Sequence, residues 1–182
     1  SKKELESMSL LLDKLSTQKE LSSVLKERIG NVAFNTDFRI GILFEMLMKD
    51  NNLKDEFKVI QAIKLYYPNT EQITDFEKAF EDIIWFYTCG KSDFSKIQKD
   101  DTKKAKTQNE EKIYDYEYDD QYIYSAFIET YQMDLQEIDY LHWWKFKAMF
   151  NSLNKDTKIV EIMGYRAIDL SKIKDKEEKA RY

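Results

Sequence analysis

Cys89 and His142 are the only thiol and the only imidazole in the sequence, and together they could form a nucleophile and its base. Such a pair works only when the two side chains lie within hydrogen-bonding reach. Cys89 follows an apolar helical pattern, where a thiol is usually buried and inert, and nothing in the sequence brings it to His142. A zinc site would need three or four ligands of these types. We therefore expect neither thiol catalysis nor zinc, and His142 is better explained by packing.

The acidic segment at residues 113–131 could instead bind a hard cation such as calcium. Its carboxylates at Asp115, Glu117 and Asp119 match positions one, three and five of an EF-hand loop. Asp120 then falls where the turn needs glycine, and Ala126 falls where the loop needs a bidentate glutamate. The calcium motif fails at both positions, and we expect no metal and no other cofactor.

The same segment has a structural interpretation. Between Lys112 and Lys145 there are eight acids and no lysine or arginine. Alternation predicts an extended approach with the acids toward solvent and with three rings packed inward: Tyr114, Tyr116 and Tyr118. Asp119 and Asp120 are then expected to cap a buried helix over residues 121–133, where carboxylates suit the positive end of the helix dipole.

Composition limits the fold and the class of function. The chain has 182 residues, 42% of them hydrophobic, with only four glycines and one proline. So few turn residues argue against an all-β domain and for long helices joined by polar loops. The net charge of −5 does not suit wrapping a phosphate backbone, one cysteine excludes an internal disulfide, and no apolar run is long enough to span a membrane. We expect an intracellular protein with no nucleic-acid, membrane or small-molecule partner.

Periodicity and punctuation predict the helices that position these residues. Helical stripes occur at residues 20–29, 36–50, 53–67, 74–89, 135–153 and from 157 onward, in addition to 121–133. Gly30, Pro68 and Gly90 provide stops, and a capping box at Thr74 and Glu77 provides a start. The predicted fold is mostly α, a single-domain multi-helix bundle with a long polar loop in the middle.

The predicted domain, residues 1–182, divides into segments of different composition. Residues 1–7 are a tag or an extension, residues 8–90 an N-terminal helical lobe, and residues 113–170 a C-terminal helical lobe. Between the lobes, residues 91–112 are rich in lysine and acids and are expected to form a mobile polar loop, and residues 171–182 form a charged tail.

Several motifs in this order resemble one family, the tailed-phage proteins typified by gene product fifteen of a temperate phage with a long flexible tail. The motifs are NTDFR (35–39), the Ile-Trp-Phe-Tyr run (84–87), YDYEYDDQYIYSAF (114–127), LHWWKF (141–146), Leu153 and GYRAIDL (164–170). The structural signature comprises six of their residues: Asp37, Arg39, His142, Trp143, Trp144 and Phe146. The chain departs from the pattern near its N-terminus, where Ser16 stands in place of an expected proline.

The resemblance implies a role more than a chemistry. Such proteins are encoded between the major tail protein and the tape-measure protein, where these phages keep tail assembly chaperones. It implies a non-enzymatic chaperone that binds the tape-measure protein in the cytoplasm of the infected host cell, with self-association plausible. The resemblance carries over no catalytic residues, and the sequence contains no phosphate-binding loop or nucleophile motif.

For the chaperone, an acidic patch for client binding is predicted at four residues: Asp115, Glu117, Asp119 and Asp120.

Two further functions stay open at this point. The same carboxylates could imitate a phosphate track, which would make the protein an inhibitor of a host nucleic-acid enzyme. A mimic needs nearly all eight acids on one surface, whereas capping and core packing scatter them. A structural virion component is the third possibility.

Overall fold

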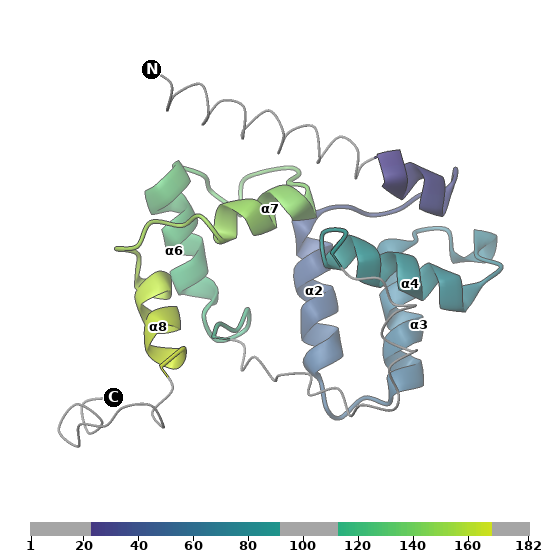
Figure 1. The fold of residues 1–182 in the computed structure, drawn as a ribbon, viewed down its shortest axis with the longest axis horizontal. Coiled ribbons are helices and arrows are strands. Elements are labelled where there is room, and N and C mark those ends of the chain that lie inside the picture. The colour runs from purple at the N-terminus through teal and green to yellow at the C-terminus, as the bar shows by residue number, and fades with distance from the viewer. Residues whose placement is uncertain (1–22, 92–112, 169–182) are drawn as a thin grey trace. The chain divides into compact units, whose positions relative to one another are not determined.

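The computed structural model describes residues 23–91 and 113–168, which are mostly helical. The prediction of a mostly α protein is confirmed. The helices are α2 (Phe38–Lys49), α3 (Asp55–Tyr66), the 3-10 turn η1 (Thr70–Gln72), α4 (Phe76–Tyr87), α6 (Asp120–Tyr131), α7 (Trp143–Phe150) and α8 (Lys158–Arg166) (Figure 1). Residues 23–29 are also helical. The β pairing in the described ranges is one antiparallel bridge, between Asp37 and His142.

The described residues fall into two compact units. The first unit contains residues 23–36 and 43–91, and the second contains residues 37–42 and 113–168. α2 therefore begins in the second unit and continues into the first. The expected N-terminal lobe at residues 8–90 differs from the first unit in this respect. Residues 1–7 and 171–182 lie outside the described residues, as does the expected polar loop apart from Lys91.

Local signals set most helix ends where the sequence predicts them. The backbone of Gly30 has a φ of +63° directly after the helical residues 23–29, a conformation that glycine adopts without strain. α3 ends at Tyr66, two residues before Pro68, and α4 ends before a turn that includes Gly90. The predicted capping box at Thr74 is wrong, because Asp75 is the N-cap of α4 and accepts a 2.9 Å hydrogen bond from the backbone N–H of Lys78.

Aromatic rings form the core of the first unit. The ring of Tyr66 is fully buried and lies 5.2 to 5.9 Å, centroid to centroid, from those of Phe34, Phe44 and Phe86. These separations are typical of favourable aromatic pairs. α3 packs against α4 (Figure 1), and the rings join both helices to the later part of α2. Burial raises the pKa of the Tyr66 hydroxyl.

The second unit is built around Phe146, which is fully buried in α7. Its ring stacks on Phe127 of α6 at 5.2 Å and on Phe38 of α2 at 4.9 Å. α8 packs against α6 and runs antiparallel to it (Figure 1), because Arg166 at the end of α8 contacts Asp119 at the start of α6. One aromatic side chain thus connects three helices that are distant in sequence.

Candidate functional site

The motifs NTDFR and LHWWKF meet in the second unit. The backbone N–H of Phe38 donates to the carbonyl of Leu141 at 2.8 Å, next to the bridge between Asp37 and His142. The Asp37 carboxylate accepts from the backbone N–H groups of Arg39 at 2.9 Å and of Leu141 at 3.3 Å. One carboxylate therefore satisfies a donor at the start of α2 and a second donor on a segment about one hundred residues away.

Arg39 fixes the loop between α6 and α7. Its guanidinium donates to the carbonyl of Ile138 at 2.6 Å and to those of Leu135 and Asp139 at 3.4 and 3.5 Å. It also pairs with Asp37 at 3.2 Å. The sequence predicts a helix over residues 135–153, but residues 135–142 form this loop and α7 begins at Trp143. Here a distant side chain, rather than helical N–H groups, binds the loop carbonyls.

The remaining signature residues surround the start of α7. His142 is the N-cap, and its Nδ1 accepts a 3.1 Å hydrogen bond from the backbone N–H of Trp144. Burial lowers the pKa of this imidazole, which favours the neutral form that an acceptor nitrogen requires. Trp143 is fully buried beside Gly41 of α2, and Trp144 is also buried. The structure brings all six signature residues together in one unit, where their contacts position α2 and α7.

Of the four carboxylates predicted for client binding, Asp119 is buried. It is 2% exposed, and the guanidinium of Arg166 donates to both of its oxygens at 2.5 and 3.0 Å. The backbone N–H of Asp115 donates to it at 2.8 Å. The hydrogen bond from Arg166 lowers the pKa of Asp119 despite partial opposition from burial. Asp119 occupies the N-cap position of α6 without a capping hydrogen bond, so its carboxylate joins α8 to α6 instead of facing a partner.

The other three carboxylates differ in their surroundings. Asp115 accepts from the backbone N–H groups of Glu117 and Tyr118 in a tight turn, so the expected extended segment is absent here. Tyr118 is 77% exposed, contrary to the expected inward ring. Glu117 and Asp120 are exposed, and neither has an ion-pair partner among the described residues. These two are the carboxylates of the predicted patch that a partner could reach.

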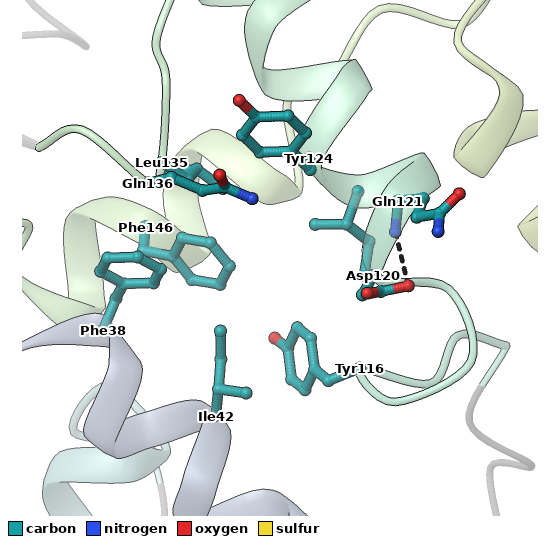
Figure 2. A pocket seen from close by; sticks show the side chains of 10 residues that line it. Phe38, Ile42, Tyr116, Asp120, Gln121, Tyr124, Leu135, Gln136 and Phe146 are labelled. Carbon is teal, nitrogen blue, oxygen red and sulfur yellow. Dashed lines mark hydrogen bonds between the residues drawn. The ribbon is translucent and has the colours of Figure 1, made fainter.

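An apolar pocket opens beside Asp120, wholly within the second unit. Its volume is about 300 Å³. Figure 2 shows side chains from α2, α6, α7 and two loops around the space. The apolar part of the lining comprises Phe38, Ile42, Tyr116, Ile123, Leu135 and Phe146. The polar part comprises Asp120, Gln121, Tyr124 and Gln136. A mostly apolar concavity with a few polar groups is the usual form of a binding site.

Acidic groups dominate the charge at this pocket. Asp120 lines it directly, and Asp134 accepts from the Tyr124 hydroxyl at 2.9 Å and from the backbone N–H of Gln136 at 2.8 Å, both of which are lining residues. The hydrogen bond from the backbone N–H of Gln136, followed by the one from the Tyr124 hydroxyl, lowers the pKa of Asp134. Arg39 bonds to the carbonyl of the lining residue Leu135, but its charge is balanced by Asp37. The pocket therefore favours a cationic group at its mouth.

Sequence reasoning identified Asp120 and Phe146 but not the pocket between them. The lining comes from three segments, 38–42, 116–124 and 135–146. Contacts of Asp37 and Arg39 join the first segment to the third, and the stacking of Phe127 on Phe146 joins α6 to α7. The available signal was that all three segments lie within or next to the family motifs.

The described residues contain no group of three or more histidine, cysteine, aspartate or glutamate side chains that could hold a metal ion. Cys89 belongs to the first unit and His142 to the second. Within the described ranges, no helix combines the length and apolar character needed to cross a membrane.

Together, the helices and the pocket define an α-helical protein with a preformed, acid-rimmed apolar site. Residues 10–182 match the family described as Bacteriophage Gp15 protein, and the chain belongs to that family. No match was found among curated proteins or among solved structures.

Proposed function

We propose that this protein is a non-enzymatic tail assembly chaperone that binds the phage tape-measure protein while a long flexible tail is assembled. Membership of the Bacteriophage Gp15 family over residues 10–182 carries the proposal. The resemblance implies that such proteins are encoded beside the tape-measure gene, and this implication supports the proposal. The proposed site of action is the cytoplasm of the infected host cell, the proposed client is the tape-measure protein, and the proposed form is a homo-oligomer. The proposal requires no cofactor, nucleic acid, membrane or small-molecule substrate.

The geometry of the second unit supports a binding role. The pocket of about 300 Å³ is walled by side chains that α2, α6 and α7 hold in place, so binding would require little ordering of the site. Helical clients commonly dock by placing apolar side chains into such a groove. A long helical tape-measure protein offers many such side chains before tail-tube subunits cover it.

The inhibitor hypothesis is less compatible with the geometry. A phosphate mimic would need nearly all eight acids of the segment on one surface, yet Asp119 is buried against Arg166. Asp115 and Asp134 each accept backbone hydrogen bonds within their own turns. These carboxylates have local structural roles that a phosphate track would not require.

Co-purification tests the chaperone proposal. The full chain, co-expressed with the tape-measure protein of the same phage, should co-purify with it and keep it soluble. The major tail protein serves as the control client. Mass spectrometry of purified virions should detect no copy of the chain, whereas a structural virion component would be present. Failure to bind the tape-measure protein, or a stoichiometric presence in virions, would refute the proposal.

A charge test of the predicted acidic patch must avoid Asp119, because its reversal would remove a buried ion pair. The suitable variant is Glu117→Lys with Asp120→Lys, since both side chains are exposed. Reduced co-purification with an unchanged circular dichroism spectrum would support the patch. Undiminished binding would remove both carboxylates from the proposal.

A further inference from the structure

The chemistry of the pocket in the second unit specifies what kind of client segment it would take. We infer that it accepts one large apolar side chain of a helical client segment, while a Lys or Arg about one turn away on that segment pairs with Asp120. This inference rests on the proposed chaperone function and deepens it, because it names the chemistry of the bound segment.

The volume of the pocket is large enough for the apolar side chain of the client, which we call the anchor. An engineered apolar cavity of about 150 Å³ holds a benzene molecule, and this pocket has about 300 Å³. The space is therefore sufficient for a Leu, Met or Phe side chain. The floor includes the rings of Phe38 and Phe146, which are 4% and 0% exposed and stack on each other. These two rings bring no charge to the base of the pocket, and the half-buried lining residues Ile42 and Leu135 offer apolar contact to an incoming side chain.

The side chains that line the pocket are held in place by other residues of the unit, so the pocket should select client segments by shape. Phe146 is held from behind by Phe127, with the two rings 6° from parallel. Tyr124 is held at the rim by Asp134. Because these side chains are already fixed by contacts within the unit, an incoming segment must fit the pocket.

The negative charge of Asp120 favours a Lys or Arg next to the anchor on the client segment. Asp120 is exposed, lines the pocket and has no ion-pair partner among the described residues. Within residues 23–91 and 113–168, the hydrogen bond that its carboxylate accepts is a local one, from the backbone N–H of Gln121 at 2.7 Å (Figure 2). The nearby Arg39 is engaged by Asp37 and three carbonyls. Residues three or four apart lie on one face of a helix, so an apolar residue and a Lys or Arg with that spacing reach the pocket and Asp120 together.

Peptide binding to the full-length chain tests the inference. Overlapping peptides that cover the tape-measure protein of the same phage are screened by fluorescence anisotropy. We expect the binding peptides to share the apolar residue with a Lys or Arg at the third or fourth position. Asp120→Lys should weaken their binding about tenfold or more, which corresponds to about 1.4 kcal/mol. Glu129→Lys is the matched control, because Glu129 is exposed on the same helix and does not line the pocket.

Exchanging the charges of Asp120 and of the peptide's Lys or Arg distinguishes a direct ion pair from a general electrostatic attraction. A peptide whose Lys or Arg is replaced by Glu should bind the Asp120→Lys variant more tightly than it binds the wild type. Gln136→Trp, at an exposed lining position, should fill the pocket and abolish binding without unfolding the protein. Methyl signals of Ile42, Ile123 and Leu135 should shift on peptide binding, while the signal of Ile159, buried in α8 outside the lining, should not.

The outcomes distinguish the two levels of the proposal. If tape-measure peptides bind equally to the wild type, Asp120→Lys and Gln136→Trp, the inference is wrong and the chaperone function stands. If no fragment of the tape-measure protein binds, both are refuted. If Gln136→Trp instead abolishes self-association measured by sedimentation, a second copy occupies the pocket and the inference is overturned.

Discussion

The carboxylate of Asp119 and the guanidinium of Arg166, 47 residues apart, form a two-pronged ion pair that joins the start of α6 to the end of α8. The side chain of Asp119 is 3% exposed, whereas that of Arg166 is 43% exposed. The carboxylate of the pair is therefore buried, while its guanidinium is partly in contact with solvent. Removal of the Arg166 guanidinium would leave the buried Asp119 carboxylate without its charged partner, while the hydrogen bond from the backbone N–H of Asp115 would remain.

Arg166→Met should destabilise the protein by about 1–3 kcal/mol, because Asp119 would lose its charged partner. Solvent access to Arg166 places the expected value toward the lower end. Chemical denaturation measures the change. Lys158→Met is the matched control, since Lys158 forms an exposed pair with Glu161 on the same helix and should matter little. Equal effects of the two variants would show that the buried pair has no special role.

The same pair should make stability depend on pH in acid. Since the hydrogen bond from Arg166 lowers the pKa of Asp119, the folded state binds a proton there less readily than the unfolded state. The contribution is complete above the ordinary aspartate pKa near 3.9 and is lost as the pH falls through the lowered pKa. The stability difference between wild type and Arg166→Met should shrink below about pH 4. A difference that stays constant down to pH 2 would contradict this assignment.

Gly41 and Gly164 should respond to alanine in opposite directions. A Cβ at Gly41 would lie 2.2 Å from a ring carbon of the fully buried Trp143, so Gly41→Ala should cost about 1–3 kcal/mol. A Cβ at Gly164 in α8 meets nothing within 4 Å, so Gly164→Ala should stabilise the helix by about 0.5–1 kcal/mol. Thermal unfolding of both variants measures the contrast. A stabilising Gly41→Ala would mean that Trp143 moves freely.

Sequence predicts the parts of this fold that depend on neighbours along the chain. Helix ends at Gly30 and Tyr66 follow from glycine geometry and from the proline ring at Pro68. Apolar spacing predicts a helix from residue 157 onward, and α8 begins at Lys158. The error at Thr74 was small, because the adjacent Asp75 offers an equally suitable cap.

The parts that sequence could not predict depend on distant partners. A stripe of apolar residues at 135–153 satisfies helical spacing, but Arg39 binds the carbonyls of Leu135 and Ile138 and keeps that segment in a loop. The same limit applies to Asp119. Its place before a helix predicts a capping role, but its carboxylate forms an ion pair with the distant Arg166 instead. The candidate site lies where such long-range contacts meet, which explains why motifs located its residues without revealing the pocket.

The imidazole of His142 caps the start of α7, so its loss should destabilise the protein. His142→Ala should cost about 1 kcal/mol, because the backbone N–H of Trp144 would lose its acceptor. His142→Asn should recover part of this loss, since an asparagine oxygen also accepts at an N-cap. Both variants lose the ring contact with Trp144 at 5.2 Å, so the capping term is the difference between them. Chemical denaturation at pH 7 measures that difference.

The pH dependence of stability provides a second test of this cap. Burial lowers the pKa of His142, so its contribution is complete above the ordinary histidine pKa near 6.5 and is lost as the pH falls through the lowered value. Protonation would convert the Nδ1 acceptor into a donor that repels the N–H of Trp144. His142 is the only histidine in the chain, so His142→Asn should abolish the decline in stability between pH 6.5 and 5. An equal decline in the wild type and His142→Asn would assign it to other groups.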